Sequence, residues 1–225
     1  MCSSDLEDPF NRASGFKLEG ALPPLPKLPP AKERPLLALE AGGHTAFVGK
    51  VFFTPKGDRV ITVGEDKAVR IWDPRTNETV KTIRFPAGPG KEGSLLAAAL
   101  SSNGKMMAVA GEPLKGTPKG KVPIYIIDAE TGAQLRQIAG ATAAVNAMHF
   151  SNDGKMLVIG NDDGALQVFN PFTGAAMGAA DTRYPAPVID IKFNQKNAQN
   201  VVATLAADRF ITLVNLRRNS AASSR

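Results

Sequence analysis

Between residues 43 and 215 the chain alternates apolar and polar positions in runs of four to six residues, and short polar turns separate the runs. Residues 60–63 form one such run. Alternation at this period places successive side chains on opposite faces of a β-strand. Asn103-Gly104 and Asp153-Gly154 are typical of tight hairpin turns, and Lys56-Gly57 is a weaker signal of the same kind. Short, evenly spaced strands with such turns between them indicate an all-β repeat.

Four segments of the chain share this pattern, so the repeat is internal. The segments 43–83 and 140–174 overlay at a constant offset of 97 residues, which matches Phe53 with Phe150 and Trp72 with Phe169. Four strands and about 46 residues per unit match the period of a β-propeller blade. Within a repeat domain of residues 37–216, we predict blades at about 43–92, 93–139, 140–181 and 182–216.

The first unit also carries two dipeptides that resemble a family signature. Gly43-His44 begins the unit and Trp72-Asp73 ends its third strand. Both look like the signature dipeptides of the WD-repeat (Trp-Asp repeat) β-propeller family. The resemblance implies a propeller of four-stranded blades and a buried hydrogen-bonded tetrad formed by His44, Thr62, Asp66 and Trp72. Such a tetrad would satisfy four buried polar groups at once, so we interpret His44 as structural.

The other three units depart from this pattern, mostly by placing apolar residues at polar positions. The second keeps Asp128 but has Ile127 in the Trp position, and the third keeps Asp163 but has Ala141, Ile159 and Phe169 in the His, Thr and Trp positions. The fourth keeps Thr204 and Asp208 but has Val214 for Trp. We therefore expect packing to replace the tetrad in these units, and expect Asp163 and Asp208 to cap their own turns.

The length of the repeat domain bears on whether the ring closes. Propellers of this family usually have about seven blades, which would need roughly 300 residues. About four blades therefore predict an incomplete, open ring of the seven-blade type, with residues 37–39 as an outer strand of a missing blade. A closed four-bladed ring is the alternative. An open series would expose sheet edges and a terminal blade face, and it should be prone to aggregation.

The terminal segments differ in composition from the repeats. Residues 2–6 read CSSDL, which is what the end of a widely used sequencing adapter encodes, so we interpret residues 1–6 as an adapter scar. Residues 7–36 are rich in proline and predict a disordered or extended linker, with a PxxP docking ligand as the alternative. Residues 217–225 show no apolar pattern and predict a disordered tail or a truncation point. With the true N-terminus then missing, the compartment stays open.

Composition and motifs favour a binding protein over an enzyme. The chain is 43% hydrophobic, it has no apolar run of membrane-spanning length, and its single cysteine and two histidines cannot build a structural zinc site. No nucleophile elbow, Walker loop or metal-spaced cluster is present, so we predict no catalysis, metal or cofactor. His149 is expected to face solvent or a neighbouring blade. Residues 87–94 only superficially resemble a phosphate loop.

The net charge of +6 gathers partly on two predicted loops, 87–94 and 112–123. In the family both connections lie on one face, where they would border a basic patch suited to an acidic protein surface or a phosphate backbone. A solubilising loop is the alternative. The predicted partner contacts are Phe47, Glu65, Lys91, Lys115, Lys119, Lys121, Asp162 and Tyr184.

We therefore predict a non-catalytic scaffold that presents its loops to other proteins, including ones with acidic surfaces, alongside the missing blades of the same chain. Two alternatives stay open. The repeats could be the propeller of a larger enzyme or regulatory protein whose catalytic domain is absent. The basic loops could also bind nucleic acid, although no aromatic residues lie among the lysines to stack on bases.

Overall fold

The computed structural model describes residues 42–194 and 201–216 of the chain. The predictions for residues 1–6, 7–36, 37–39 and 217–225 lie outside the described residues. Within the described part, the regular secondary structure consists of fifteen β-strands.

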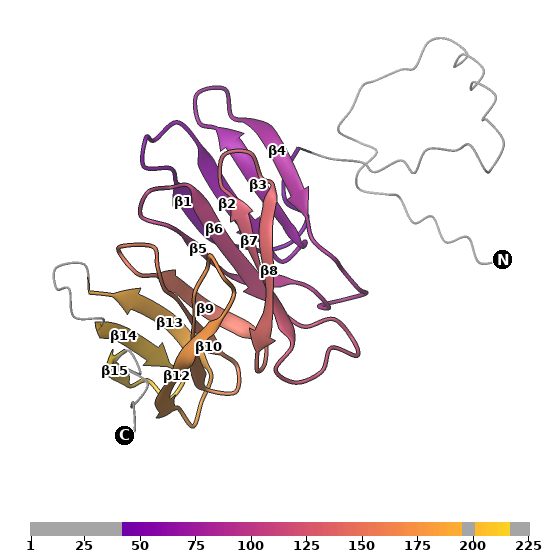
Figure 1. Ribbon diagram of the computed structural model, residues 1–225. Coiled ribbons are helices and arrows are strands. Elements are labelled where there is room, and N and C mark those ends of the chain that lie inside the picture. Colours follow the sequence, from indigo (N-terminus) through magenta and orange to yellow (C-terminus); the bar gives the residue numbers. More distant parts are fainter. Residues whose placement is uncertain (1–41, 195–200, 217–225) are drawn as a thin grey trace, which may run out of the picture. The chain divides into compact units, whose positions relative to one another are not determined.

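The strands form four antiparallel sheets that follow one another along the chain (Figure 1). Sheet 1 contains β1 (Val48–Phe53), β2 (Val60–Gly64), β3 (Ala68–Asp73) and β4 (Glu78–Arg84). Sheet 2 contains β5 (Leu95–Leu100), β6 (Met106–Gly111), β7 (Val122–Asp128) and β8 (Gln134–Ala141). Sheet 3 contains β9 (Val145–Phe150), β10 (Leu157–Asn161), β11 (Ala165–Phe169) and β12 (Ala176–Arg183). Sheet 4 contains β13 (Val188–Phe193), β14 (Val201–Ala206) and β15 (Ile211–Asn215). This arrangement confirms the all-β architecture of propeller-type blades.

Hairpin turns set the register within each sheet. Gly104 and Gly154 adopt φ values of 69° and 68°, and each N–H donates to a serine carbonyl three residues earlier at 2.8 Å. Positive φ is the conformation that glycine adopts without steric cost, so the two Xaa-Gly signals fix the turns between the first two strands of sheets 2 and 3. Each strand then pairs with its neighbour in sequence.

Three apolar clusters lie between consecutive sheets. Ile61, Val69 and Ile71 of sheet 1 pack with residues such as Val109 and Ile127 of sheet 2. A second cluster joins sheets 2 and 3, and a third joins sheets 3 and 4. Because each inner sheet is apolar on both faces, the clusters tie the four sheets into one series. Burial of this apolar surface is the main favourable contribution to the stability of the series.

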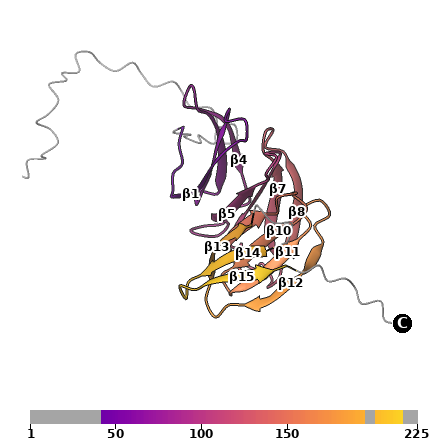
Figure 2. The same cartoon turned by 90° about the vertical axis from the view of Figure 1, so that its left-hand side faces the viewer.

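The series does not close within the described residues. No strand pairing and no apolar cluster among residues 42–194 and 201–216 joins sheet 4 back to sheet 1. Sheet 4 also has three described strands where the repeat predicts four; β13, β14 and β15 lie side by side in Figure 2. No described strand lies beside the outer edge of β15, and the described residues end at Leu216, one residue after this strand.

Candidate functional site

His44, Thr62, Asp66 and Trp72 lie together on one side of sheet 1. The Nδ1 atom of His44 is 2.8 Å from Oδ1 of Asp66, and its Nε2 atom is 2.7 Å from Oγ1 of Thr62. The indole N–H of Trp72 donates to the same Thr62 hydroxyl at 2.8 Å. The backbone N–H of Thr45 donates to Oδ2 of Asp66 at 3.1 Å. We call this chain of hydrogen bonds the sheet 1 network.

The electrostatics of the sheet 1 network favour an ionised Asp66. Burial alone would raise the pKa of Asp66, but hydrogen bonds from His44 and from the Thr45 N–H outweigh it and hold the pKa below its ordinary value. In the neutral imidazole, Nδ1–H then donates to this carboxylate, which leaves Nε2 to accept the Thr62 O–H. The side chains of His44 and Asp66 are both buried, so their polar atoms are used within the sheet.

Sheet 3 contains a different polar network at the equivalent place. The hydroxyl of Thr142 donates to Oδ1 of Asp163 at 3.1 Å, and the amide of Asn161 donates to Thr142 Oγ1 at 3.0 Å and to Gln167 Oε1 at 2.7 Å. Arg183 forms an ion pair with the other oxygen of Asp163 at 2.7 Å. We call these five residues the sheet 3 network.

Asp163 does cap its own turn as expected, because its Oδ1 atom accepts the Ala165 N–H at 3.3 Å. The expectation that packing alone replaces its polar side-chain partners is wrong. Ile159 and Phe169 do pack in the core between sheets 2 and 3. The missing polar partner comes from Thr142, one residue after the Ala141 that we aligned with His44. The sequence signals for this network are the hydroxyl of Thr142 next to the expected His position and the two polar residues Asn161 and Gln167 among apolar neighbours.

In sheets 2 and 4 the retained aspartates act as turn caps. Asp128 accepts the backbone N–H groups of Glu130 at 3.0 Å and Thr131 at 2.6 Å. Asp208 accepts the N–H of Phe210 at 3.0 Å, as expected for a turn residue. Ile127 and Val214, which stand in the Trp positions, are buried in the apolar clusters.

Three connections at the same end of the strands of sheets 1 and 2 form the candidate interaction site. They are the turn 65–67 between β2 and β3, the loop 85–94 between β4 and β5, and the loop 112–121 between β6 and β7. Antiparallel strands alternate in direction, so every second connection lies at the same end of the strands. We call these three segments the loop surface.

Hydrogen bonds join the first two segments of the loop surface. The hydroxyl of Ser94 donates to the Glu65 carbonyl at 3.1 Å. The ammonium group of Lys67 donates to the Gly88 carbonyl at 2.5 Å. The turn of sheet 1 and the loop that enters sheet 2 are therefore fixed to each other.

The long loop 112–121 is fixed to the same site. The N–H of Glu112 donates to the Ser94 carbonyl at 2.9 Å, and the N–H of Lys115 donates to Oε2 of Glu92 at 3.1 Å. A small pocket below these loops is lined by Pro86, Gly93, Leu95, Ala110, Gly111, Glu112, Leu114, Pro123 and Tyr125. The two basic loops therefore contact each other and border one surface.

The exposed charged side chains of the loop surface are all cations, although Lys67 is half-buried like the carboxylates. Its exposed cations are Lys91, Lys115, Lys119 and Lys121, whereas the half-buried carboxylates are Glu65, Glu92 and Glu112. Because Glu92 is also occupied by the Lys115 N–H, the charge that reaches solvent is predominantly positive.

The remaining predicted contacts fall in different environments. Phe47 is 71% exposed just before β1, where its carbonyl accepts the Glu65 N–H at 2.9 Å. Asp162 is exposed on the β10–β11 turn of sheet 3 and accepts the Asn146 amide at 3.2 Å. Tyr184 is a correction: its side chain is buried between sheets 3 and 4, and its hydroxyl bonds to Thr204. A tyrosine hydroxyl that needs a buried partner draws the ring into the core, so Tyr184 is not a surface contact.

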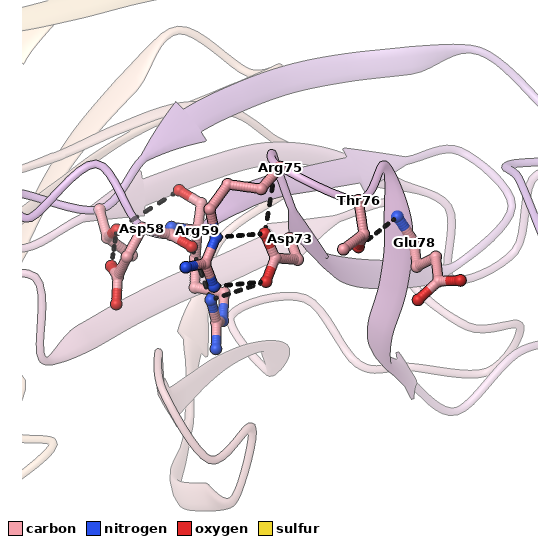
Figure 3. A network of polar contacts seen from close by, with 7 residues as sticks. Asp58, Arg59, Asp73, Arg75, Thr76 and Glu78 are labelled. Atoms are coloured by element: carbon pink, nitrogen blue, oxygen red, sulfur yellow. Dashed lines mark hydrogen bonds and ion pairs between the residues drawn. The ribbon is translucent and has the colours of Figure 1, made fainter.

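A compact charged network lies at the opposite end of the strands of sheet 1 (Figure 3). Asp73 ends β3, accepts the backbone N–H of Arg75 at 2.9 Å and forms an ion pair with its guanidinium at 3.0 Å. Arg59 approaches the same carboxylate to 3.6 Å from the β1–β2 turn. Hydrogen bonds from Arg75 hold the pKa of Asp73 at about 2. These interactions join residues of the β1–β2 and β3–β4 turns only, so the two turns stabilise each other.

Residues 42–194 and 201–216 contain no cluster of three or more His, Cys, Asp and Glu side chains arranged to hold a metal ion. In the same part of the chain, no helix is long and apolar enough to cross a membrane.

Comparison with known proteins adds sequence relatives to this geometry. A family model described as "WD domain, G-beta repeat" matches residues 35–73 and 132–170. The second match runs from just before β8 through β9, β10 and β11. One sequence repeat therefore contains the last strand of sheet 2 and the first three strands of sheet 3, so the repeat is shifted by one strand relative to the sheet.

Among the curated relatives, the rat protein named "Serine-threonine kinase receptor-associated protein" is 24% identical over 195 residues, which cover 75% of this chain and 55% of the relative. Mouse "WD repeat-containing protein 90" is 27% identical over 154 residues, which cover 68% of this chain and 8% of the relative. A rice "Guanine nucleotide-binding protein subunit beta" is 25% identical over 133 residues, which cover 59% of this chain and 33% of the relative. The chain thus spans about half the length of the first relative and less of the other two.

Proposed function

Because this chain belongs to the WD40 repeat family, we propose that it is a protein-interaction scaffold that has no catalytic step of its own and docks partners on its loop surface. The observation that carries the proposal is the joining of three connections into one surface on which four lysines are exposed while Glu65, Glu92 and Glu112 are half-buried. Loops fixed on a rigid array of sheets are the usual place for binding residues in a repeat protein.

The positive charge of the loop surface favours a partner with an acidic surface. Lys91, Lys115, Lys119 and Lys121 are exposed, so an acidic segment could contact several of them without displacing a buried group. Exposed ion pairs contribute only a few tenths of a kcal/mol to about 1 kcal/mol each, so such docking depends on several lysines at once. The names of two relatives, a receptor-associated protein and a subunit of a guanine nucleotide-binding protein, are in keeping with work inside an assembly.

A charge-reversal experiment tests the proposal. The loop variant changes Lys115, Lys119 and Lys121 to Glu, and a fluorescent polyglutamate peptide serves as the acidic probe. Losing three exposed ion pairs should weaken binding of the peptide by roughly tenfold or more, measured by fluorescence anisotropy.

The chain offers a matched control at the other edge of the sheets. Lys56, Lys105 and Lys155 are exposed on the turns between the first two strands of sheets 1, 2 and 3. Changing these three to Glu alters the net charge by the same amount but should leave peptide binding nearly unchanged. Equal losses in the two variants would show that net charge, and not the loop surface, attracts the peptide.

A second arm separates protein docking from nucleic-acid binding. The same anisotropy measurement is made with a labelled DNA duplex across a range of salt concentrations. A nucleic-acid binder would show a steep linear fall of log affinity with log salt concentration. We expect weak DNA binding, and tight, salt-steep binding that the loop variant abolishes would contradict the proposal of a protein partner.

A further inference from the structure

The small pocket below loops 85–94 and 112–121 has a buried lining that belongs to sheet 2. This lining comes from Leu95 of β5, Ala110 and Gly111 of β6, and Tyr125 of β7. Leu95 pairs with Gly111 in the sheet, and the ring centroid of Tyr125 lies 4.9 Å from that of Phe85 in the core between sheets 1 and 2. Strand pairing and core packing therefore fix the buried lining before any ligand arrives.

The rim of the pocket is apolar as well. Pro86 is exposed, and Leu114 and Pro123 are half-buried, so these three residues form the more accessible part of the lining. A Cβ atom on Gly93 would lie 3.3 Å from Cδ2 of Leu114, which shows that the two loops contact each other at the rim. An apolar rim above an apolar interior favours an apolar ligand group, and the small size of the pocket limits that group to one short side chain.

Tyr125 contributes a polar group to the lining that the folded chain leaves unused. Tyr125 is 6% exposed, and burial raises the pKa of its hydroxyl. Among the residues that the structure describes, none forms a hydrogen bond with this hydroxyl. The hydroxyl of the other tyrosine, Tyr184, bonds to Thr204, as buried tyrosine hydroxyls usually do. The Tyr125 O–H is therefore a donor that a ligand in the pocket can use.

The charges around the pocket determine which residues of a ligand can lie inside it and beside it. Lys91, Lys115 and Lys121 are exposed, and each stands within two positions of a residue that lines the pocket. Glu112 is the one carboxylate in the lining, and it repels an acidic side chain inside the pocket. An acidic segment would therefore place its carboxylates against the lysines and an uncharged side chain in the pocket.

We propose that the pocket anchors one short aliphatic side chain of an acidic partner segment, and that the Tyr125 hydroxyl donates a hydrogen bond to a backbone carbonyl of the same segment. The proposal rests on the proposed function, because it names the kind of segment that docks on the loop surface. The lysines attract the segment, and the pocket sets its register. The proline-rich residues 21–35 of this chain are the alternative occupant, but they carry three cations and one carboxylate, so the basic loop surface disfavours them.

Two labelled peptides test the pocket itself. One has valine at the centre of six glutamates. The other has threonine there, which keeps the shape of the side chain but replaces a methyl group with a hydroxyl. By fluorescence anisotropy, the unmodified chain should bind the valine peptide roughly three- to fivefold more tightly. Because the two peptides have the same charge, this ratio should persist when added salt weakens the binding of both.

The two tyrosines of the chain provide a matched pair of variants. Tyr125→Phe removes a hydroxyl that has no partner in the folded chain, so it should not lower the free energy of unfolding but should weaken binding of the valine peptide roughly two- to tenfold. Tyr184→Phe removes the hydroxyl that bonds to Thr204, so it should lower the free energy of unfolding and leave peptide binding unchanged. Urea unfolding gives the stability of each variant.

The outcomes separate this proposal from the proposed function. Equal binding of the two peptides, or unchanged affinity in Tyr125→Phe, would overturn the pocket proposal even if the loop variant still loses the peptide and so supports the proposed function. A valine preference that remains while the loop variant binds normally would contradict the acidic character of the partner. Displacement of the valine peptide by a peptide of residues 21–35 would identify that segment as the occupant and would also overturn the proposal.

Discussion

The Thr62 hydroxyl is the junction of the sheet 1 network. It accepts the Trp72 N–H and bonds to Nε2 of His44, which in turn contacts Asp66. One oxygen therefore satisfies the Trp72 N–H and the His44 Nε2 atom, both in part-buried hydrogen bonds, and its removal would leave both groups without this partner. An unsatisfied buried polar group costs about 1–3 kcal/mol, more than the net value of a typical hydrogen bond.

Thr62→Val should therefore lower the free energy of unfolding by about 1–3 kcal/mol, because it keeps the shape of the side chain but removes its hydroxyl. Urea unfolding followed by Trp72 fluorescence measures the change. Thr117→Val makes the same atomic change in loop 112–121 and should have little effect. Equal effects in both variants would contradict the junction role of Thr62.

His149 shows how a single residue can make the contact between sheets sensitive to pH. Its Nδ1 atom is 2.7 Å from the Phe150 carbonyl, and its ring lies 5.9 Å from that of Phe193 in sheet 4. Burial lowers the pKa of His149 below 6.5; Lys192 adds to this, while the Phe150 carbonyl and Asp190 oppose it.

Since the folded chain binds this proton less readily than the unfolded chain, the stabilising contribution of a neutral His149 is present above pH 6.5 and is lost as the pH falls below that value. The free energy of unfolding should therefore decrease from pH 7.5 to about 5.5. His149→Phe should reduce that slope, and an unchanged slope would show that another group titrates. Denaturant melts at several pH values make the comparison.

At the scale of the elements, turns decide where each strand begins. Gly154 and Gly164 both adopt positive φ, at 68° and 78°. A Cβ atom on Gly154 would meet nothing within 4 Å, whereas one on Gly164 would lie 2.1 Å from the Tyr184 carbonyl oxygen. The β10–β11 turn therefore needs glycine for space as well as for conformation.

Gly154→Ala should cost roughly 1–2 kcal/mol, the strain of a left-handed residue. Gly164→Ala should cost clearly more, because the backbone at Tyr184 would also have to move. Thermal melts of the two variants compare the costs directly. A smaller loss in Gly164→Ala than in Gly154→Ala would contradict the close packing of sheet 3 against residue 184.

At the scale of the whole molecule, the same residue type has different consequences at different places in the series. Phe150 is 1% exposed between sheets 2 and 3, and its repeat equivalent Phe53 is 66% exposed on sheet 1. Phe150→Ala would leave a cavity, but Phe53→Ala would not.

We expect Phe150→Ala to reduce the free energy of unfolding by about 3–5 kcal/mol. Phe53→Ala should change it by no more than about 0.5 kcal/mol, because Phe53 is 66% exposed. A large loss in Phe53→Ala would contradict the exposure of this side chain on sheet 1.

The sequence alone determined the all-β class, the repeat and the hairpin turns, because strand alternation and Xaa-Gly turns are local signals. The set of residues in the sheet 1 network was implied by the resemblance of the Gly43-His44 and Trp72-Asp73 dipeptides to the WD-repeat signature. Only the tertiary structure decided which loops contact each other, that Thr142 joins Asp163 in sheet 3, and that Tyr184 is buried. It also decided which apolar faces stay uncovered, since Phe53 and Phe150 occupy equivalent positions in the repeat and differ only in whether a neighbouring sheet packs against them. Burial depends on contacts between segments far apart in the chain, and no local pattern specifies them.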